Sequence, residues 1–197
     1  VREHHFEDAY LQSLLGLKTR MTQTKEELEK TAWHEAGHAL VSLLTGHEVP
    51  RVSILPRERT LGVSFSKPKH ESFANNNREE LLEKVMVGLG GFCAERSKYG
   101  QVTPGAFDDL RRANKLISDM VNLYGMGDGI LTGITSDYIT SDAMKVKFDQ
   151  CMMDMLQQCV KSTDRLLEEN KDALEALALG LLEKETLFDR EISAIVS

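Results

Sequence analysis

Five residues, His34-Glu35-Ala36-Gly37-His38, limit the folds open to this chain more than any others. This HExxH sequence lies in a stretch with apolar residues at helical spacing, which begins with the capping-box sequence Thr24-Lys25-Glu26-Glu27 and ends before Gly46. Residues four apart share one face of a helix, so both imidazoles can converge on one metal ion. The sequence therefore predicts a helix over residues 25–45 that carries two metal ligands.

The acidic residue of the motif, Glu35, points in a neighbouring direction, from which its carboxylate can reach a metal-bound water without ligating the metal. Zinc lowers the pKa of such a water toward neutrality, Glu35 takes the proton, and the hydroxide attacks a scissile carbonyl. Chance would give an HExxH sequence in about one of fifty chains of this composition, and the helical setting makes a chance match rarer. The motif predicts zinc-dependent peptide hydrolysis with Glu35 as general base.

A catalytic zinc needs a third protein ligand and one open position. The extended HExxHxxGxxH pattern is absent, because Val41 and Leu44 stand where it requires Gly and His. Spacing alone leaves five candidates for the third ligand: Glu95, Asp108, Asp109, His47 and His70. The two histidines are more typical of exposed loop residues, and Glu95 competes with the two aspartates.

Helical patterns predominate along the rest of the chain. Two or three short strands are expected over 49–65, helices over 77–98, 103–124 and 141–170, and further helical segments up to the C-terminus. Glycines at 88, 90 and 91 weaken the second helix locally unless another backbone packs closely there. We therefore expect a mainly α fold with a small β-sheet of short strands.

At least one edge of so small a sheet is expected to be open, and an open edge can accept an extended peptide as an additional strand. The candidate edge strand runs over residues 61–66. Its predicted substrate-binding residues are Leu61, Gly62, Val63, Ser64 and Phe65. The alternative is an ordinary half-buried strand that binds no ligand.

Composition excludes several classes of protein. The chain has 197 residues and a formal net charge of −7, from 24 Lys+Arg and 31 Asp+Glu, so a nucleic-acid partner is not expected. No apolar stretch approaches the roughly 20 residues of a membrane-spanning helix. The three cysteines form no CxxC pair, which favours buried thiols in a reducing compartment. Because the chain starts at Val1 and lacks an initiator Met, we expect it to be part of a longer protein.

Longer motifs surround the HExxH sequence. It lies within the run Thr31-Ala32-Trp33-His34-Glu35-Ala36-Gly37-His38-Ala39-Leu40. Further pieces follow along the chain: Pro56-Arg57, Leu61-Gly62, Gly90-Gly91, Ala94-Glu95, Thr103, Gly105-Ala106 and Asp109-Leu110. Together they resemble the FtsH-type AAA protease family over nearly the whole chain.

The resemblance implies a helical zincin-like fold with one zinc ion per chain. It makes Asp109 the third ligand, since this residue matches the Asp of the family's Thr-Gly-Ala-x-Asn-Asp-Leu-like segment. Glu95 matches a family glutamate once considered for the same role. The sequence departs from the family pattern at Phe92-Cys93, Pro104 and Phe107-Asp108, none of which removes a catalytic group. Asp108 is expected to face solvent at a helix N-terminus.

The resemblance also implies a domain organisation. Residues 1–20, with Phe6-Glu7-Asp8-Ala9, are similar to the end of an ATPase lid domain, and residues 21–197 form a zinc metalloprotease domain. No GxxxxGK[ST] phosphate loop occurs in the chain, so ATP would be hydrolysed in a separate module. The intact protein would be a membrane-anchored homo- or hetero-hexamer that degrades unfolded or membrane-protein substrates. This domain would face the bacterial cytosol or the interior of a mitochondrion or chloroplast.

Two other functions remain open at this point. A catalytically silent relative could keep the fold for ring assembly, although the intact His34, Glu35, His38 and Asp109 argue against it. The other alternative is a stand-alone zinc peptidase with a thermolysin-like mechanism. The resemblance of residues 1–20 to the end of an ATPase lid domain argues against it.

Overall fold

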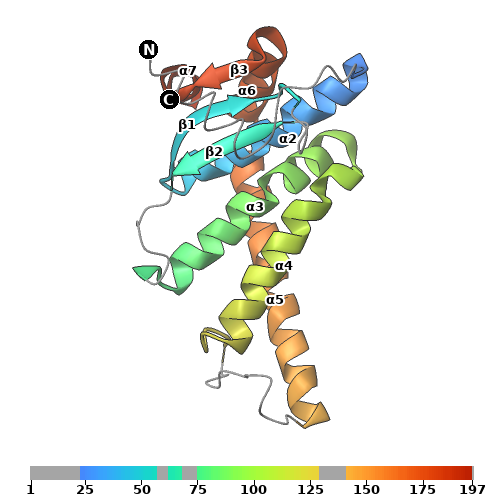
Figure 1. Cartoon of the computed structure of the whole chain (residues 1–197), viewed down its shortest axis with the longest axis vertical. Helices are drawn as coiled ribbons and strands as arrows, with labels where there is room; N and C mark the ends of the chain where they lie inside the picture. Colours follow the sequence, from blue (N-terminus) through green and yellow to red (C-terminus); the bar gives the residue numbers. More distant parts are fainter. Residues whose placement is uncertain (1–22, 57–61, 68–74, 129–140, 197) are drawn as a thin grey trace.

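The computed structural model describes residues 23–56, 62–67, 75–128 and 141–196 (Figure 1). The predicted lid remnant, Leu61 and His70 lie outside these ranges. The described elements are, in chain order, α2 (Lys25–Leu44), β1 (Glu48–Ser53), β2 (Val63–Lys67), α3 (Arg78–Tyr99), a 3-10 helix (Pro104–Ala106), α4 (Phe107–Asn122), α5 (Asp142–Glu169), α6 (Lys171–Lys184), β3 (Thr186–Phe188) and α7 (Asp189–Val196). The predicted mainly α fold with a small sheet is confirmed.

Local capping explains where the two central helices begin. At the start of α2, Glu27 N donates to Thr24 Oγ1 at 3.2 Å, and Thr24 N donates to the Glu27 carboxylate at 2.7 Å. Asn77 and Glu80 make the same reciprocal pair at the start of α3. Helix α3 ends at Tyr99, and the capping residue Gly100 has a left-handed φ of 68°, which suits a residue without a side chain.

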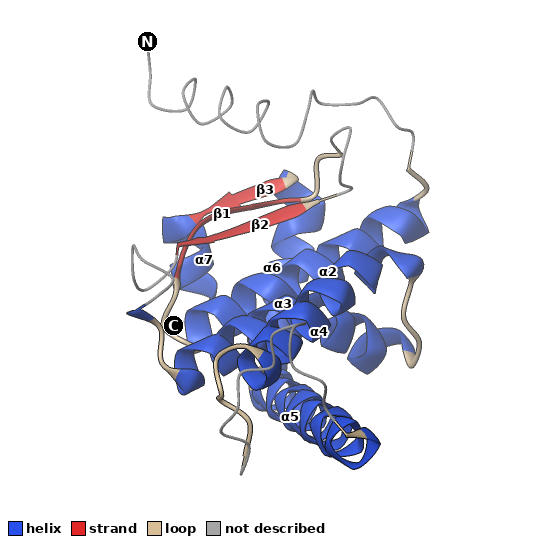
Figure 2. Cartoon of the chain, turned by 60° about the horizontal axis from the view of Figure 1, so that its bottom comes forward, coloured by secondary structure: helices blue, strands red, loops and turns tan. Residues whose placement is uncertain are grey.

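The strands form one antiparallel sheet in the order β2-β1-β3, which Figure 2 shows as a layer on one side of the helices. Arg51 of β1 lies opposite Phe65 of β2 and Phe188 of β3. Two strands lie in the predicted region, but the third comes from the C-terminal part, where only helices were expected. β3 has three residues, too few to show a period-two pattern. β2 is an edge strand, paired only with β1 among the described strands.

The third predicted helix begins differently from the expectation. Thr103 and Pro104 open a 3-10 turn, in which Gly105 N donates to Thr103 Oγ1 at 3.3 Å, and α4 starts only at Phe107. This turn places Asp109 in the first turn of α4.

Helices α2 and α3 touch through their backbones. A Cβ added to Gly90 would lie 2.6 Å from the carbonyl oxygen of Gly37, and one added to Gly91 would lie 2.6 Å from Nδ1 of His34. The close approach of another backbone, the condition set by the sequence, is therefore met at Gly90, whereas Gly91 faces the side chain of His34. It does not extend to Gly88, around which no atom lies within 4 Å of such a Cβ.

Helix α2 is the centre of the packing, in contact with α3, α6 and the sheet. Helix α5 lies against α3 and α4, and Arg96 of α3 is paired with Asp164 of α5 at 2.6 Å. All three cysteines are buried free thiols, as predicted. In the part of the chain that the structure describes, no helix has both the length and the apolar character required to cross a bilayer.

Candidate metal centre

Three side chains converge between α2 and the first turn of α4. His34 Nε2 lies 3.0 Å from Asp109 Oδ2 and 3.0 Å from His38 Nε2. His38 Nε2 lies 3.3 Å from the same oxygen of Asp109. The fold thus gathers donor atoms from residues up to 75 positions apart in the sequence.

The outer nitrogen of each imidazole has its own acceptor. His34 Nδ1 is 2.7 Å from Glu95 Oε1, and His38 Nδ1 is 2.7 Å from the carbonyl oxygen of Val87. Both acceptors favour a proton on Nδ1, which leaves the Nε2 lone pairs directed at Asp109. Glu95 therefore orients one histidine and does not face the point where the three donors meet.

The donor set fits a zinc ion. In a tetrahedral site with bonds of about 2.0–2.1 Å, ligand atoms lie about 3.3 Å apart, close to the three separations found here. Two imidazole nitrogens and one carboxylate oxygen also match the three-ligand pattern of catalytic zinc, which keeps a fourth position open. If both histidines are neutral and protonated on Nδ1, the two Nε2 atoms and Asp109 Oδ2 are all acceptors. They would then face one another with no proton between them.

The electrostatics of the cluster favour a positive charge at the same point. Burial lowers the pKa of His34, but its hydrogen bonds to Asp109 and Glu95 outweigh this effect and raise that pKa to about 10. Burial raises the pKa of Asp109, yet hydrogen bonds from His34 and His38 hold it well below the usual range. A bound cation would replace the proton that His34 otherwise attracts.

Glu35 lies beside this cluster and is only 6% exposed. Burial raises the pKa of its carboxyl group, while positive charge on His34 or His38 lowers it. A Cβ added to Gly62 would lie 2.7 Å from Glu35 Oε1, so the backbone leading into β2 packs against the carboxylate. This contact limits where the predicted general base can move.

Other candidates for the third ligand lie elsewhere. Thr103 N donates to Glu95 Oε2 at 2.7 Å, and this bond together with that from His34 lowers the pKa of Glu95 despite burial. Asp108 is exposed and paired with Arg111 at 3.0 Å, as expected for a solvent-facing position. The expectation that His47 is exposed is wrong: it is buried, because its backbone N–H donates to Ser42 O and folds the chain back onto α2.

A cleft of about 1050 Å³ contains the three clustered side chains and Glu35. Parts of α2, α3, β2 and the start of α4 form its walls. Of the predicted substrate-binding residues, Gly62, Val63 and Ser64 line the cleft, whereas Phe65 does not. Ser66 lines the cleft as well, so the strand contributes residues on either side of Phe65.

Comparison with known proteins agrees with this geometry. The family model for peptidase family M41 matches residues 21–195. The chain belongs to peptidase family M41. It is similar to the ATP-dependent zinc metalloprotease FtsH of Borreliella burgdorferi (33% identity, 96% of this chain, 32% of the relative) and of Cupriavidus metallidurans (32% identity, 98% and 32%). FtsH 1 of Sorangium cellulosum is 35% identical over 98% of this chain and 34% of the relative. The chain thus spans about a third of the length of these curated relatives.

Sequence reasoning missed several groups around the candidate metal centre of this M41 chain. The Val87 carbonyl and the Thr103 N–H are backbone groups, and no side-chain pattern reveals them. Arg112 donates through Nη2 to Asp109 Oδ1. Its spacing of three residues from Asp109 on a helix is the signal that could have found it.

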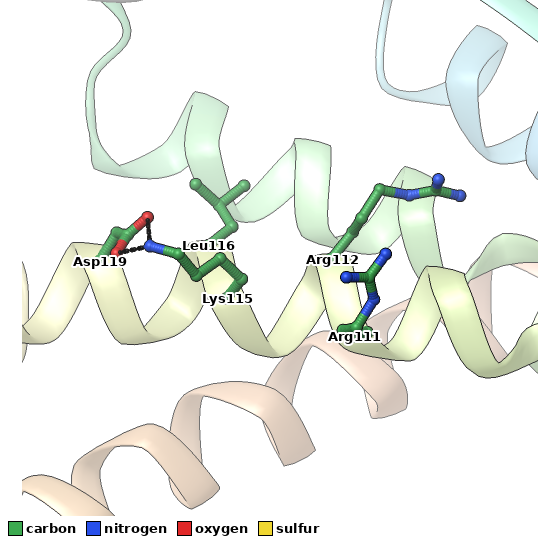
Figure 3. Close-up of a pocket in the computed structure, with 5 residues that line it drawn as sticks. All are labelled: Arg111, Arg112, Lys115, Leu116 and Asp119. Carbon is green, nitrogen blue, oxygen red and sulfur yellow. Dashed lines mark hydrogen bonds and ion pairs between the residues drawn. The ribbon is translucent and has the colours of Figure 1, made fainter.

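Arg112 also lines a second hollow, of about 290 Å³, formed by residues of α4 (Figure 3). Its other lining residues are Arg111, Lys115, Leu116 and Asp119. Lys115 is paired with Asp119 at 2.7 Å, so the basic groups of this hollow are partly neutralised by acidic neighbours. Arg112 and Leu116 line both this hollow and the main cleft.

Proposed function

We propose that this chain is the zinc-dependent endopeptidase domain of an ATP-dependent, membrane-anchored protease, and that it hydrolyses peptide bonds of unfolded or misfolded proteins. The observation that carries the proposal is the convergence of His34, His38 and Asp109 on one point next to the buried Glu35. The relatives named above are ATP-dependent zinc metalloproteases. ATP would be used in a separate module of the intact protein, in a homo- or hetero-hexameric assembly that lies in a reducing compartment.

In this proposal His34, His38 and Asp109 hold one zinc ion per chain. When bound, the ion supplies a Lewis acid that polarises the scissile carbonyl and acidifies a water molecule. Glu35 accepts a proton from the attacking water and returns it to the leaving amine nitrogen. The raised pKa of Glu35 suits a group that must both take up and release a proton.

The edge strand β2 offers a way to hold many different substrates. A protease acting on unfolded chains gains from recognising the peptide backbone, and an edge strand does so by adding the substrate as a further strand. Gly62, Val63 and Ser64 lie along the cleft that contains Glu35. A peptide paired with β2 would therefore pass near the general base.

Glu35→Gln tests the proposed chemistry. The variant keeps the shape of the side chain and removes its ability to take a proton, so cleavage of an unfolded protein should fall by about 10²–10⁴-fold. Zinc content, measured by elemental mass spectrometry, should stay at one ion per chain. Glu26→Gln, an exposed position on the same helix, serves as the matched control and should cleave normally.

Two results would contradict the proposal. Undiminished cleavage by Glu35→Gln would remove the assigned general base. A wild-type protein without zinc after metal-replete purification, and inactive with added zinc, would instead favour a catalytically silent assembly domain.

A further inference from the structure

Two neighbouring arginines on α4, Arg111 and Arg112, form ion pairs with aspartates that differ in burial. The side chains of Arg111 and Arg112 are 67% and 69% exposed, and each pairs with an aspartate three residues earlier. Arg111 pairs with Asp108, whose side chain is 62% exposed, whereas Arg112 pairs with Asp109, whose side chain is 10% exposed. Figure 3 shows both arginines on the same helix. Arg112 thus reaches from solvent to a buried carboxylate.

The two oxygens of that carboxylate have separate partners. Oδ2 lies 3.0 Å from His34 Nε2 and 3.3 Å from His38 Nε2, at the point where the donors meet. Oδ1 accepts a hydrogen bond from Arg112 Nη2. A guanidinium bound to one oxygen fixes the rotation of the carboxyl group and leaves the other oxygen for a metal.

We propose that Arg112 is a positioning residue for the metal centre, which keeps Asp109 as a ligand through the single oxygen Oδ2. The inference rests on the proposed zinc site and adds an outer partner for the third ligand. The three ligands are then all oriented from outside: His34 by Glu95, His38 by the Val87 carbonyl and Asp109 by Arg112.

This role predicts an effect on metal binding and little effect on folding. Ion pairs with an exposed partner contribute little to stability, because solvent screens them and the long side chain loses entropy. Partners that orient a ligand change metal affinity by about 10–100-fold when they are removed. Arg111 offers a matched control, since it has the same exposure and spacing but holds an aspartate outside the cluster.

The experiment compares wild type, Arg112→Gln, Arg112→Lys and Arg111→Gln in the native-length protein. Zinc affinity is measured by competition with a chromophoric chelator, and ligand geometry by the visible absorption spectrum of the cobalt-substituted protein. We expect Arg112→Gln to bind zinc about 10–100-fold more weakly and to show an altered cobalt spectrum. Arg112→Lys keeps the charge and should recover part of the affinity, while Arg111→Gln should match wild type.

The outcomes separate this inference from the proposed function. If wild type binds zinc and Arg112→Gln matches Arg111→Gln in affinity and cobalt spectrum, the positioning role is wrong and the zinc site stands. If wild type itself binds neither metal, the zinc site fails and the inference fails with it. Equal melting temperatures of the metal-free variants would show that an affinity loss in Arg112→Gln comes from the site and not from the fold.

Discussion

The two sides of the cleft are held in place in different ways. The helix side, formed by α2, α3 and α4, has backbones in direct contact at Gly37 and Gly90 and packs Gly91 against the ring of His34. The strand side is the edge strand β2, which is only partly buried and pairs with β1 alone among the described strands. The two sides meet where Gly62 packs against Glu35.

This difference matches what the proposed function requires of each side. Metal ligands must be held within a few tenths of an ångström, which requires rigid elements and outer partners for every ligand. Binding many peptide sequences requires an accessible backbone edge with few fixed side-chain contacts. Rigid helices on one side of the cleft and an accessible edge strand on the other meet these two requirements.

The largest effect is expected from Gly37→Ala. Alanine in a helix normally gains about 0.5–1 kcal/mol over glycine. Here the new Cβ would collide with the Gly90 carbonyl, and overpacking of this kind costs about 1–3 kcal/mol or more. We expect a lower free energy of unfolding in urea and loss of zinc. Gly88→Ala, with open space around the new Cβ, should instead be as stable as wild type or more stable.

Gly91→Ala should separate metal binding from folding. Its Cβ would meet the ring of His34, and displacing the ring moves one ligand away from the other two. We expect zinc affinity to fall by about 10–100-fold with a smaller change in stability than for Gly37→Ala. Chelator competition measures the affinity, again with Gly88→Ala as control. Wild-type affinity in Gly91→Ala would show that the His34 ring tolerates the displacement.

Gly62→Ala should affect catalysis without releasing the metal. The atoms that its Cβ would meet belong to the flexible end of Glu35, which can move aside without disturbing the fold. A misplacement of about 1 Å in a catalytic group can cost about 100-fold in rate, so kcat should fall while zinc content stays unchanged. Ser64→Ala, on the same side of the cleft, is the control. An unchanged kcat in Gly62→Ala would show that Gly62 does not restrain the carboxylate.

Local signals predicted much of the helix side. The capping pairs Thr24/Glu27 and Asn77/Glu80 act over three residues, so the sequence alone indicates where α2 and α3 begin. The HExxH spacing is also a short-range signal, because residues four apart in a helix, here His34 and His38, lie on the same face. The glycines of α3 also indicated the contact between α2 and α3, because they would weaken the helix unless another backbone packed closely against it.

Features that depend on distant parts of the chain were not visible in the residues alone. β3 has three residues and pairs with β1 across more than a hundred positions, with Ser53 Oγ hydrogen-bonded to Thr186 Oγ1 at a separation of 133. Spacing left five candidates for the third ligand, because only the fold brings the start of α4 to α2. The family resemblance, and not the spacing, singled out Asp109. Backbone acceptors such as Val87 O leave no trace in the sequence at all.

The smallest effects are expected on the strand side, and they should follow a pattern. If a substrate pairs with β2, alternate N–H groups of the peptide donate to the strand and the others point away. N-methylation of single residues along a peptide substrate should therefore raise KM by about 2- to 10-fold at every second position, the range of a lost hydrogen bond. KM should change little at the positions between, and Ser64→Ala should not alter the pattern because its backbone is unchanged. A uniform response along the peptide would mean that the substrate does not extend β2, and recognition would then have to come from side chains on the helix side of the cleft.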